Sequence, residues 1–178
     1  MVEALLALLD AGDPQPSMPR IAARAGVSLR SVFQHFADRE SLYAAVYERQ
    51  FARVAPLLGG LDAAAPLAAR AAALAAQRAR VFTFIAPVRR AALRLAATSP
   101  AIAIRLATFR AAQRGEVARL FAAELRSLPP GPRRRRAAMA AALCGFSTWE
   151  VLRSHQGLSA AAAERAMAEA LDALLRAP

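Results

Sequence analysis

The sequence between residues 17 and 46 contains side chains that can form hydrogen bonds with nucleic-acid bases. Arg30 and Gln34 are four positions apart, so on a helix they share one face. The guanidinium of an arginine can donate two hydrogen bonds to guanine, and the amide of a glutamine can pair with adenine. An exposed helix with these two residues is therefore a candidate for reading the major groove of DNA.

The residues before this pair predict the first half of a helix-turn-helix. Ser17 can cap a helix whose apolar side chains, among them Ile21, face inward. Gly26 permits a sharp turn after that helix, and we expect Val27 to pack into the angle between the two helices. The turn places a second helix directly after it.

The second helix is expected to begin at Ser28, whose side chain can cap it. Val32 and Phe36 would point toward the core, which leaves the other faces of the helix exposed. In helix-turn-helix proteins the N-terminal part of this helix enters the major groove. The exposed residues would be Leu29, Arg30, Ser31, Phe33 and Gln34.

The fourth helix of the chain is predicted to start at Asp38, with Ser41 at its third position. Arg39 lies in the first turn of that helix, where its guanidinium could meet the DNA backbone beside the groove.

This region resembles the DNA-binding domain of the tetracycline-repressor (TetR) family of bacterial regulators. The resemblance rests on three segments, covers roughly residues 2 to 50 and is specific to that family. They are IAARAGVS, the aromatic-x-His-Phe element at residues 33–36, and DRESL at residues 38–42.

The resemblance implies a set of DNA contacts. Most of the sequence reading would come from Arg30, Ser31 and Gln34. The full set of expected DNA-binding residues is Ser17, Arg20, Ser28, Leu29, Arg30, Ser31, Phe33, Gln34, His35 and Arg39.

Within that set, the residues expected to contact phosphates are Ser28, His35 and Arg39. Phe33 stands where many family members have tyrosine, so a phenol–phosphate hydrogen bond is missing. The chain also begins almost inside its first helix, without the basic arm usual in the family, so we expect weaker nonspecific affinity. The alternatives are that Ser28 only caps a helix, that His35 is packed or solvated, and that the remaining polar residues form a solvated face.

The composition predicts an all-α fold of about nine helices. Alanine and leucine dominate, and no segment alternates apolar and polar residues for long enough to form a strand. Turn residues end four short helices before residue 61. Five longer helices follow, separated by Pro66, Pro87, Ser99-Pro100, the cluster at 129–132 and Gly157.

The chain is expected to have two functional parts. Residues 1–46 would form a three-helix DNA-binding domain, and residues 47–178 a helical ligand-binding and dimerisation domain. The alanine-rich helices expected near 132–155 and 159–176 could form a homodimer face or ordinary core. Candidates for lining a pocket for a small-molecule effector, or for plain core, are Phe82, Phe84, Phe109, Phe121, Phe146 and Trp149.

Charge alone is a poor guide to the partner. The net charge is +11 and every basic residue is arginine, but residues 1–57 contain as many acidic as basic residues. Arg89, Arg90 and Arg94 could contact an acidic ligand or form a solvated face. The run Arg133–Arg136 is open to the same two interpretations, solvated surface or anion contact.

Other classes of function have little support in the sequence. There are two histidines, no Gly-rich phosphate loop and no acidic pair at metal-ligand spacing, so we expect no catalytic residues, metal or cofactor. Arginine interrupts every apolar stretch before membrane-spanning length, no secretory signal is present, and we expect a cytoplasmic protein. Cys144 lies in an apolar stretch and is expected to fill core. The alternative function is a helical interaction protein or membrane-surface binder without sequence-specific DNA binding.

Overall fold

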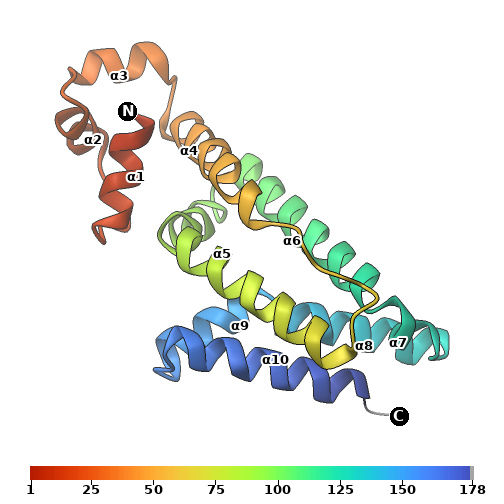
Figure 1. Ribbon diagram of the computed structural model, residues 1–178. Helices are drawn as coiled ribbons and strands as arrows, with labels where there is room; N and C mark the ends of the chain where they lie inside the picture. The colour runs from red at the N-terminus through yellow and green to blue at the C-terminus, as the bar shows by residue number, and fades with distance from the viewer. Residues whose placement is uncertain (177–178) are drawn as a thin grey trace. The chain divides into compact units, whose positions relative to one another are not determined.

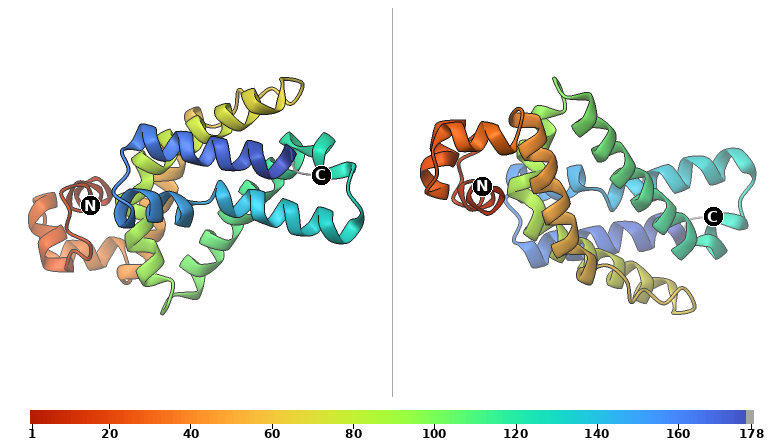
Figure 2. Two further views of the ribbon diagram at one scale, coloured as in Figure 1. Left: turned by 90° about the horizontal axis from the view of Figure 1, so that it is seen from below. Right: turned by 90° about the horizontal axis from the view of Figure 1, so that it is seen from above.

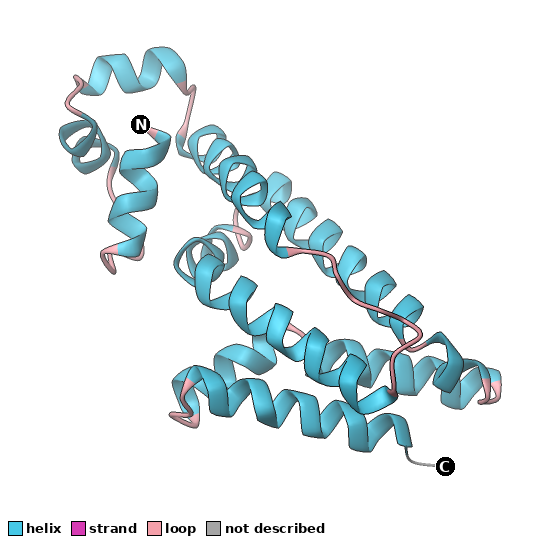
Figure 3. Cartoon of the chain, in the orientation of Figure 1, coloured by secondary structure: helices cyan, strands magenta, loops and turns pink. Residues whose placement is uncertain are grey.

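The computed structural model describes residues 1–176, and this part of the chain is helical without strands (Figure 3). The all-α prediction is confirmed, with ten α-helices in the described part where the sequence predicts about nine. They are α1 (Val2–Asp10), α2 (Met18–Ala25), α3 (Leu29–His35), α4 (Arg39–Val54), α5 (Leu67–Leu95), α6 (Pro100–Leu120), α7 (Ala122–Arg126), α8 (Pro130–Leu143), α9 (Phe146–Glu150) and α10 (Ala160–Arg176). A 3₁₀ turn, η1 (Ala55–Leu57), follows α4, and a π-helical turn, η2 (Val151–His155), follows α9.

The chain forms two compact units. The first unit contains residues 1–56 and 84–107, and the second contains residues 57–83 and those from 108 onward. Helices α1 to α4 therefore lie in the first unit, whereas α5 and α6 each contribute residues to both. The functional division after residue 46 stays a prediction.

The core of the first unit is built from aliphatic side chains. Helix α1 packs against both α2 and α4, and α2 packs against α3 (Figure 1). Leu5, Ile21, Leu42 and Val46 have no exposed surface, and Ile102 of α6 joins the same cluster. Because these residues come from α1, α2, α4 and α6, their shared burial fixes these four helices against each other.

The core of the second unit joins α5, α6, α7, α8 and α10. Leu74, Phe121 and Leu171 are fully buried in it, together with Ala140 and Cys144. Helices α8 and α10 run side by side (Figure 2). Small residues such as Ala140 allow this close approach of two helices.

Pro87 does not end a helix, in contrast to the sequence-based expectation. It lies inside α5, which continues to Leu95. An internal proline cannot bond the carbonyl four residues earlier, here Thr83, at a cost of about 3 kcal/mol. Burial of Ile85 and Val88 on either side of it offsets that cost. The division between the two units falls directly after Thr83.

Tertiary contacts end α6 before the helix expected from the sequence would end. Arg70 donates a hydrogen bond of 2.7 Å to the Leu120 carbonyl, and its guanidinium lies 5.5 Å from the Phe121 ring centroid. The carbonyl at the end of α6 is thereby bonded to a side chain from another helix. Phe121 leaves helical geometry with φ −111° and ψ 29°, and α7 begins after it.

The single helix predicted at 132–155 is divided in two at Gly145. Gly145 is extended, and a Cβ at this position would lie 3.1 Å from the Ala142 carbonyl oxygen. Thr148 also donates a hydrogen bond of 2.7 Å to that oxygen. A side chain at residue 145 would crowd this carbonyl, which favours glycine there, and α9 starts directly after it.

We predict that Leu42→Ala lowers the free energy of unfolding by about 2 to 5 kcal/mol, because it opens a cavity in the core of the first unit. Leu93→Ala is the matched control, since Leu93 is 42% exposed and its loss should cost less than about 0.5 kcal/mol. Urea unfolding followed by circular dichroism measures both. Equal losses would contradict the assigned core.

Candidate nucleic-acid interface

Helix α2 and the turn after it have the geometry of a helix-turn-helix. The Ser17 side chain accepts a hydrogen bond of 3.4 Å from the Arg20 backbone N–H, which confirms the predicted cap. Gly26 has φ +67°, a left-handed conformation that glycine adopts without strain. Val27 is 37% exposed, so the prediction that it packs between the helices is wrong. Ile21, fully buried, fills the core on this side of the turn instead.

Helix α3 is held by a cap at its start and by one fully buried side chain. The Ser28 hydroxyl accepts a hydrogen bond of 3.1 Å from the Ser31 N–H, as predicted for a cap. Val32 has no exposed surface, and the half-buried Phe36 packs against the core at the end of the helix. A helix of seven residues fixed in this way leaves most of its surface to solvent.

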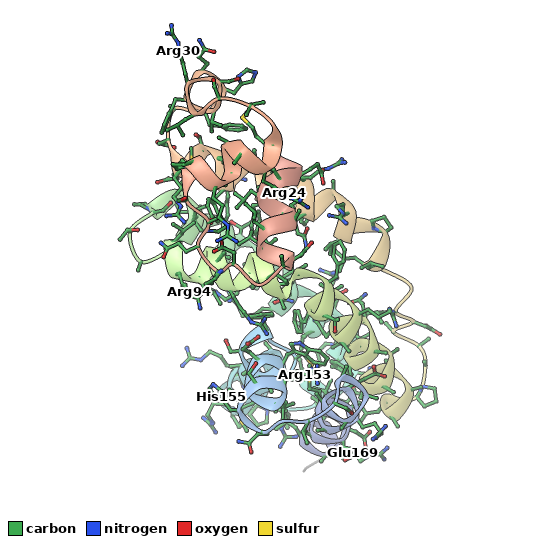
Figure 4. All side chains as sticks on the ribbon, turned by 90° about the vertical axis from the view of Figure 1, so that its left-hand side faces the viewer. Arg24, Arg30, Arg94, Arg153, His155 and Glu169 are labelled. Atoms are coloured by element: carbon green, nitrogen blue, oxygen red, sulfur yellow. The ribbon has the colours of Figure 1, made fainter. Side chains whose placement is uncertain are left out.

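The exposed surface of α3 contains the candidate base-reading residues. Arg30 and Gln34 are exposed, and neither has a hydrogen-bond or ion-pair partner within residues 1–176. The Arg30 side chain extends away from the ribbon (Figure 4). Leu29 and Phe33 are 39% and 49% exposed and provide apolar surface one helical turn apart. Such apolar side chains suit contact with thymine methyl groups or deoxyribose.

His35 is exposed at the end of α3, and its hydrogen bond restricts its chemistry. Nδ1 lies 3.1 Å from the Ser31 carbonyl oxygen. A carbonyl oxygen only accepts, so Nδ1 must carry a proton. A phosphate oxygen also only accepts, which means that Nε2 can donate to DNA only when the ring is a doubly protonated imidazolium.

Helix α4 starts with the predicted reciprocal cap. The Asp38 side chain accepts a hydrogen bond of 2.7 Å from the Ser41 N–H, and the Ser41 hydroxyl lies 3.3 Å from the Asp38 N–H. The hydrogen bond from the Ser41 backbone lowers the pKa of Asp38. A negative charge at a helix N-terminus also interacts favourably with the helix dipole.

Arg39 is directed into the protein rather than fully into solvent. Its guanidinium donates to the Pro16 carbonyl at 3.3 Å and to the Tyr43 hydroxyl at 3.4 Å, and it lies 5.3 Å from the Tyr43 ring centroid. The structure therefore gives Arg39 a role in fixing the start of α4 against the loop before α2. Arg20 remains 63% exposed while pairing with Asp13 at 3.3 Å.

Three of the six aromatic residues proposed for a ligand pocket lie together, and the other three lie elsewhere. Phe82 meets the Phe146 ring edge-on at 5.5 Å and lies 6.3 Å from the Trp149 ring, and all three are buried. These rings pack on each other as core. Phe121 lies under Arg70 elsewhere in the second unit, Phe109 is half-buried, and Phe84 belongs to the first unit beneath Arg53.

The arginines that the sequence left open differ in their surroundings. Arg133 donates hydrogen bonds to the carbonyls of Leu128 and Arg126, so it caps the end of α7. Arg89 is only 5% exposed, which excludes a solvated face at that position, whereas Arg90 and Arg94 are exposed.

Cys144 is buried as predicted. Burial raises the pKa of its thiol to about 12, so the thiol stays neutral and unreactive near neutral pH.

The second unit contains a hollow that the sequence did not predict. It has a volume of about 400 Å³ and lies between the loop before α5 and the last turns of α6, with Glu116 and Arg119 among its lining residues. Glu116 and Arg119 are three positions apart on a helix, but that spacing is common and did not single them out.

Known proteins resemble this chain both in the sequence of its N-terminal residues and in its fold. Residues 3–46 match the family model described as bacterial regulatory proteins, tetR family. A crystal structure of a transcriptional regulator from Rhodococcus sp. Rha1 has the same overall fold, with a TM-score of 0.74 and 21% sequence identity. That similarity covers 98% of this chain and 94% of the other. No curated protein sequence matches significantly.

A capped helix-turn-helix with a free polar face defines the class as DNA-binding transcriptional regulators. Residues 3–46 thus have the pattern of the DNA-binding domain of the tetR family of bacterial regulatory proteins. No helix within residues 1–176 is long and apolar enough to cross a membrane. No group of three potential metal ligands occurs in the described part of the chain.

We predict that Arg30→Ala relaxes the preference for the cognate base pair by about 1 to 3 kcal/mol, because a bidentate contact with guanine is lost. Arg30→Lys is the matched variant: it keeps the charge but not the planar fork, so nonspecific affinity should be retained while the preference falls. Competition binding on operator and single-base variants measures this. Equal weakening on every DNA would contradict base reading by Arg30.

We predict that His35→Ala weakens binding to all DNA sequences alike, because a phosphate contact from the ring Nε2 is lost while base reading is untouched. Fluorescence anisotropy at constant salt compares the variant with the wild type on operator and unrelated DNA. A change in base preference would contradict the phosphate role.

Proposed function

We propose that the protein is a homodimeric repressor that binds an inverted-repeat operator through α3 and is released by a small molecule. The observation that supports it best is the free polar face of α3, where Arg30 and Gln34 have no partner within the described residues. Exposed side chains with unused hydrogen-bond donors suit contact with base edges in the major groove.

The set of DNA-contacting residues proposed above remains the expected interface, with a different main role for Arg39. Ser17, Ser28 and His35 lie at helix ends, where backbone and side-chain donors can meet phosphates. Arg39 acts chiefly by positioning α4, because its guanidinium is already bonded to Pro16 and Tyr43.

A dimer is needed because one seven-residue helix reads too few base pairs for an operator. Two half-sites one DNA turn apart require the two recognition helices to be separated by roughly 34 to 36 Å. The proposed dimer surface is formed by α8, α9, η2 and α10. On it Met139 is 54% exposed and Val151 is 41% exposed, and apolar side chains of this kind favour burial against a second copy.

Release by a small molecule follows if the molecule binds better to a form whose recognition helices have the wrong separation. Helix α4 is the proposed lever, since Arg39 in its first turn bonds the Pro16 carbonyl in the loop before α2. Its later residues contact α5 and α6: Gln50 donates to the Phe84 carbonyl at 3.2 Å, and Glu48 pairs with Arg105.

Selection of binding sites from random DNA tests the function, at a stated salt concentration. We expect the wild type to recover a short inverted repeat and to sediment as a dimer. Met139→Asp should sediment as a monomer and lose the repeat, because the charge would have to be buried in the dimer face. Leu93→Asp is the matched control and should behave as the wild type, since Leu93 is exposed outside the proposed face.

Recovery of no sequence by the wild type would contradict the repressor and favour an interaction protein. A dimeric Met139→Asp variant would contradict only the dimer face.

A further inference from the structure

We propose that the hollow between the loop at residues 58–66 and the end of α6 is the effector site, and that its ligand is a small organic acid with a hydroxyl or amino group. This inference rests on the proposed ligand-controlled release from DNA. The loop is the long segment between η1 and α5 in Figure 3. The hollow lies entirely in the second unit and has a volume of about 400 Å³.

Buried polar side chains connect the two walls of the hollow. Gln77, fully buried on α5, donates from its amide nitrogen to the Gly59 carbonyl at 3.4 Å. The Gln77 amide oxygen accepts from Arg78 at 3.0 Å, and Arg78 pairs with Glu116 at 2.5 Å. A continuous polar chain therefore runs from the loop to α6 through Gln77 and Arg78.

The buried part of this chain carries a cost in free energy. Arg78 is 1% exposed, and its Nε has no hydrogen-bond partner within the described residues. A buried charge is tolerated only when it is paired, and an unbonded donor beside it adds a further cost. Natural proteins often retain such costly groups at functional sites.

The charges at the hollow favour an anion. Glu116 lines it, but its charge is balanced by Arg78 behind it. Arg119 also lines the hollow, is exposed, and has no ion-pair or hydrogen-bond partner within residues 1–176. One guanidinium is thus left without a counterion, and its planar fork matches a carboxylate.

The remaining lining describes the rest of the ligand. The only hydrogen bond of Glu116 in the described part is the one from Arg78 to its Oε2, so Oε1 can accept from a ligand hydroxyl or ammonium group. Leu61, Ala63 and Leu120 add apolar surface, which suits a hydrocarbon or aromatic body. The carboxylate would lie at Arg119, the donor at Glu116 and the apolar body against the leucines.

The position of the loop suggests how such a ligand would act. Residues 58–66 continue the chain directly after α4 and η1. The loop is fastened to α5 by the Gln77 contact at Gly59 and by a hydrogen bond of 2.8 Å from Arg70 to the Ala65 carbonyl. A ligand that bonds to both walls favours one arrangement of this loop over others and so biases the segment that leaves α4.

Thermal-shift and calorimetric titrations of the full chain with salicylate, 4-hydroxybenzoate and mandelate test the site. The corresponding amides are probes of the same shape without the charge. We expect at least one acid to bind and its amide to bind much more weakly. Arg119→Gln should lower the affinity for the acid roughly 10- to 100-fold, which corresponds to the loss of one charged hydrogen bond. Arg114→Gln, an exposed arginine of α6 outside the hollow, should leave binding unchanged.

Ala63→Trp provides a second variant, because the indole should fill the hollow and abolish binding without disturbing the buried core. Binding of no acid, equal binding of the amides, or undiminished binding to Arg119→Gln would overturn the site. Operator release is measured separately. If an acid binds through Arg119 but leaves the operator complex intact, the binding site is upheld and ligand-controlled release is refuted. If another compound releases the Arg119→Gln variant from the operator, ligand-controlled release is upheld and the hollow is refuted as the effector site.

Discussion

The left-handed backbone at Gly26 is the constraint on which the DNA-binding surface depends. With φ +67° at this one residue, the chain passes from α2 to α3 through a short turn at residues 26–28. Ile21 before the turn and Val32 after it are then both fully buried within the first unit. Burial of these two side chains decides which face of α3 points to solvent, and Arg30 and Gln34 lie on that face as a consequence.

A short capped helix is suited to presenting side chains to DNA, because only a few residues have to be ordered to define the orientation of the helix. Helix α3 has seven residues, too few to be stable alone in water. Its stability comes from the Ser28 cap, from the burial of Val32 and from packing against the neighbouring helix α2. Arg39 contributes from the other side by bonding the Pro16 carbonyl, which joins the start of α4 to the loop before α2. The interface is thus positioned by residues that do not themselves have to touch DNA.

The second unit is organised differently, around buried arginines as well as apolar side chains. Arg70 bonds the Leu120 carbonyl and pairs with Glu124, where the guanidinium holds the pKa of that carboxyl below its usual value. Arg78 makes an equivalent pair with Glu116. Such pairs stabilise a fold weakly in net terms but specify one arrangement, since breaking either of them leaves a buried charge alone. They fix the 58–66 loop and the end of α6, where hydrophobic packing alone would allow alternatives.

The sequence by itself determined the helical fold, the helix-turn-helix and its caps at Ser17, Ser28 and Asp38. These features depend on residues within four positions of each other, where backbone geometry and side-chain hydrogen bonds are local. The features that depend on contacts between residues far apart in the sequence were decided only by the tertiary structure. It turned Arg39 inward, continued α5 through Pro87, ended α6 at Phe121 and separated three of the aromatic residues expected in one pocket from the other three. It also brought Gly59, Arg78 and Glu116 together from three separate segments. Spacing along a chain does not encode such contacts, because burial depends on which helices pack against each other.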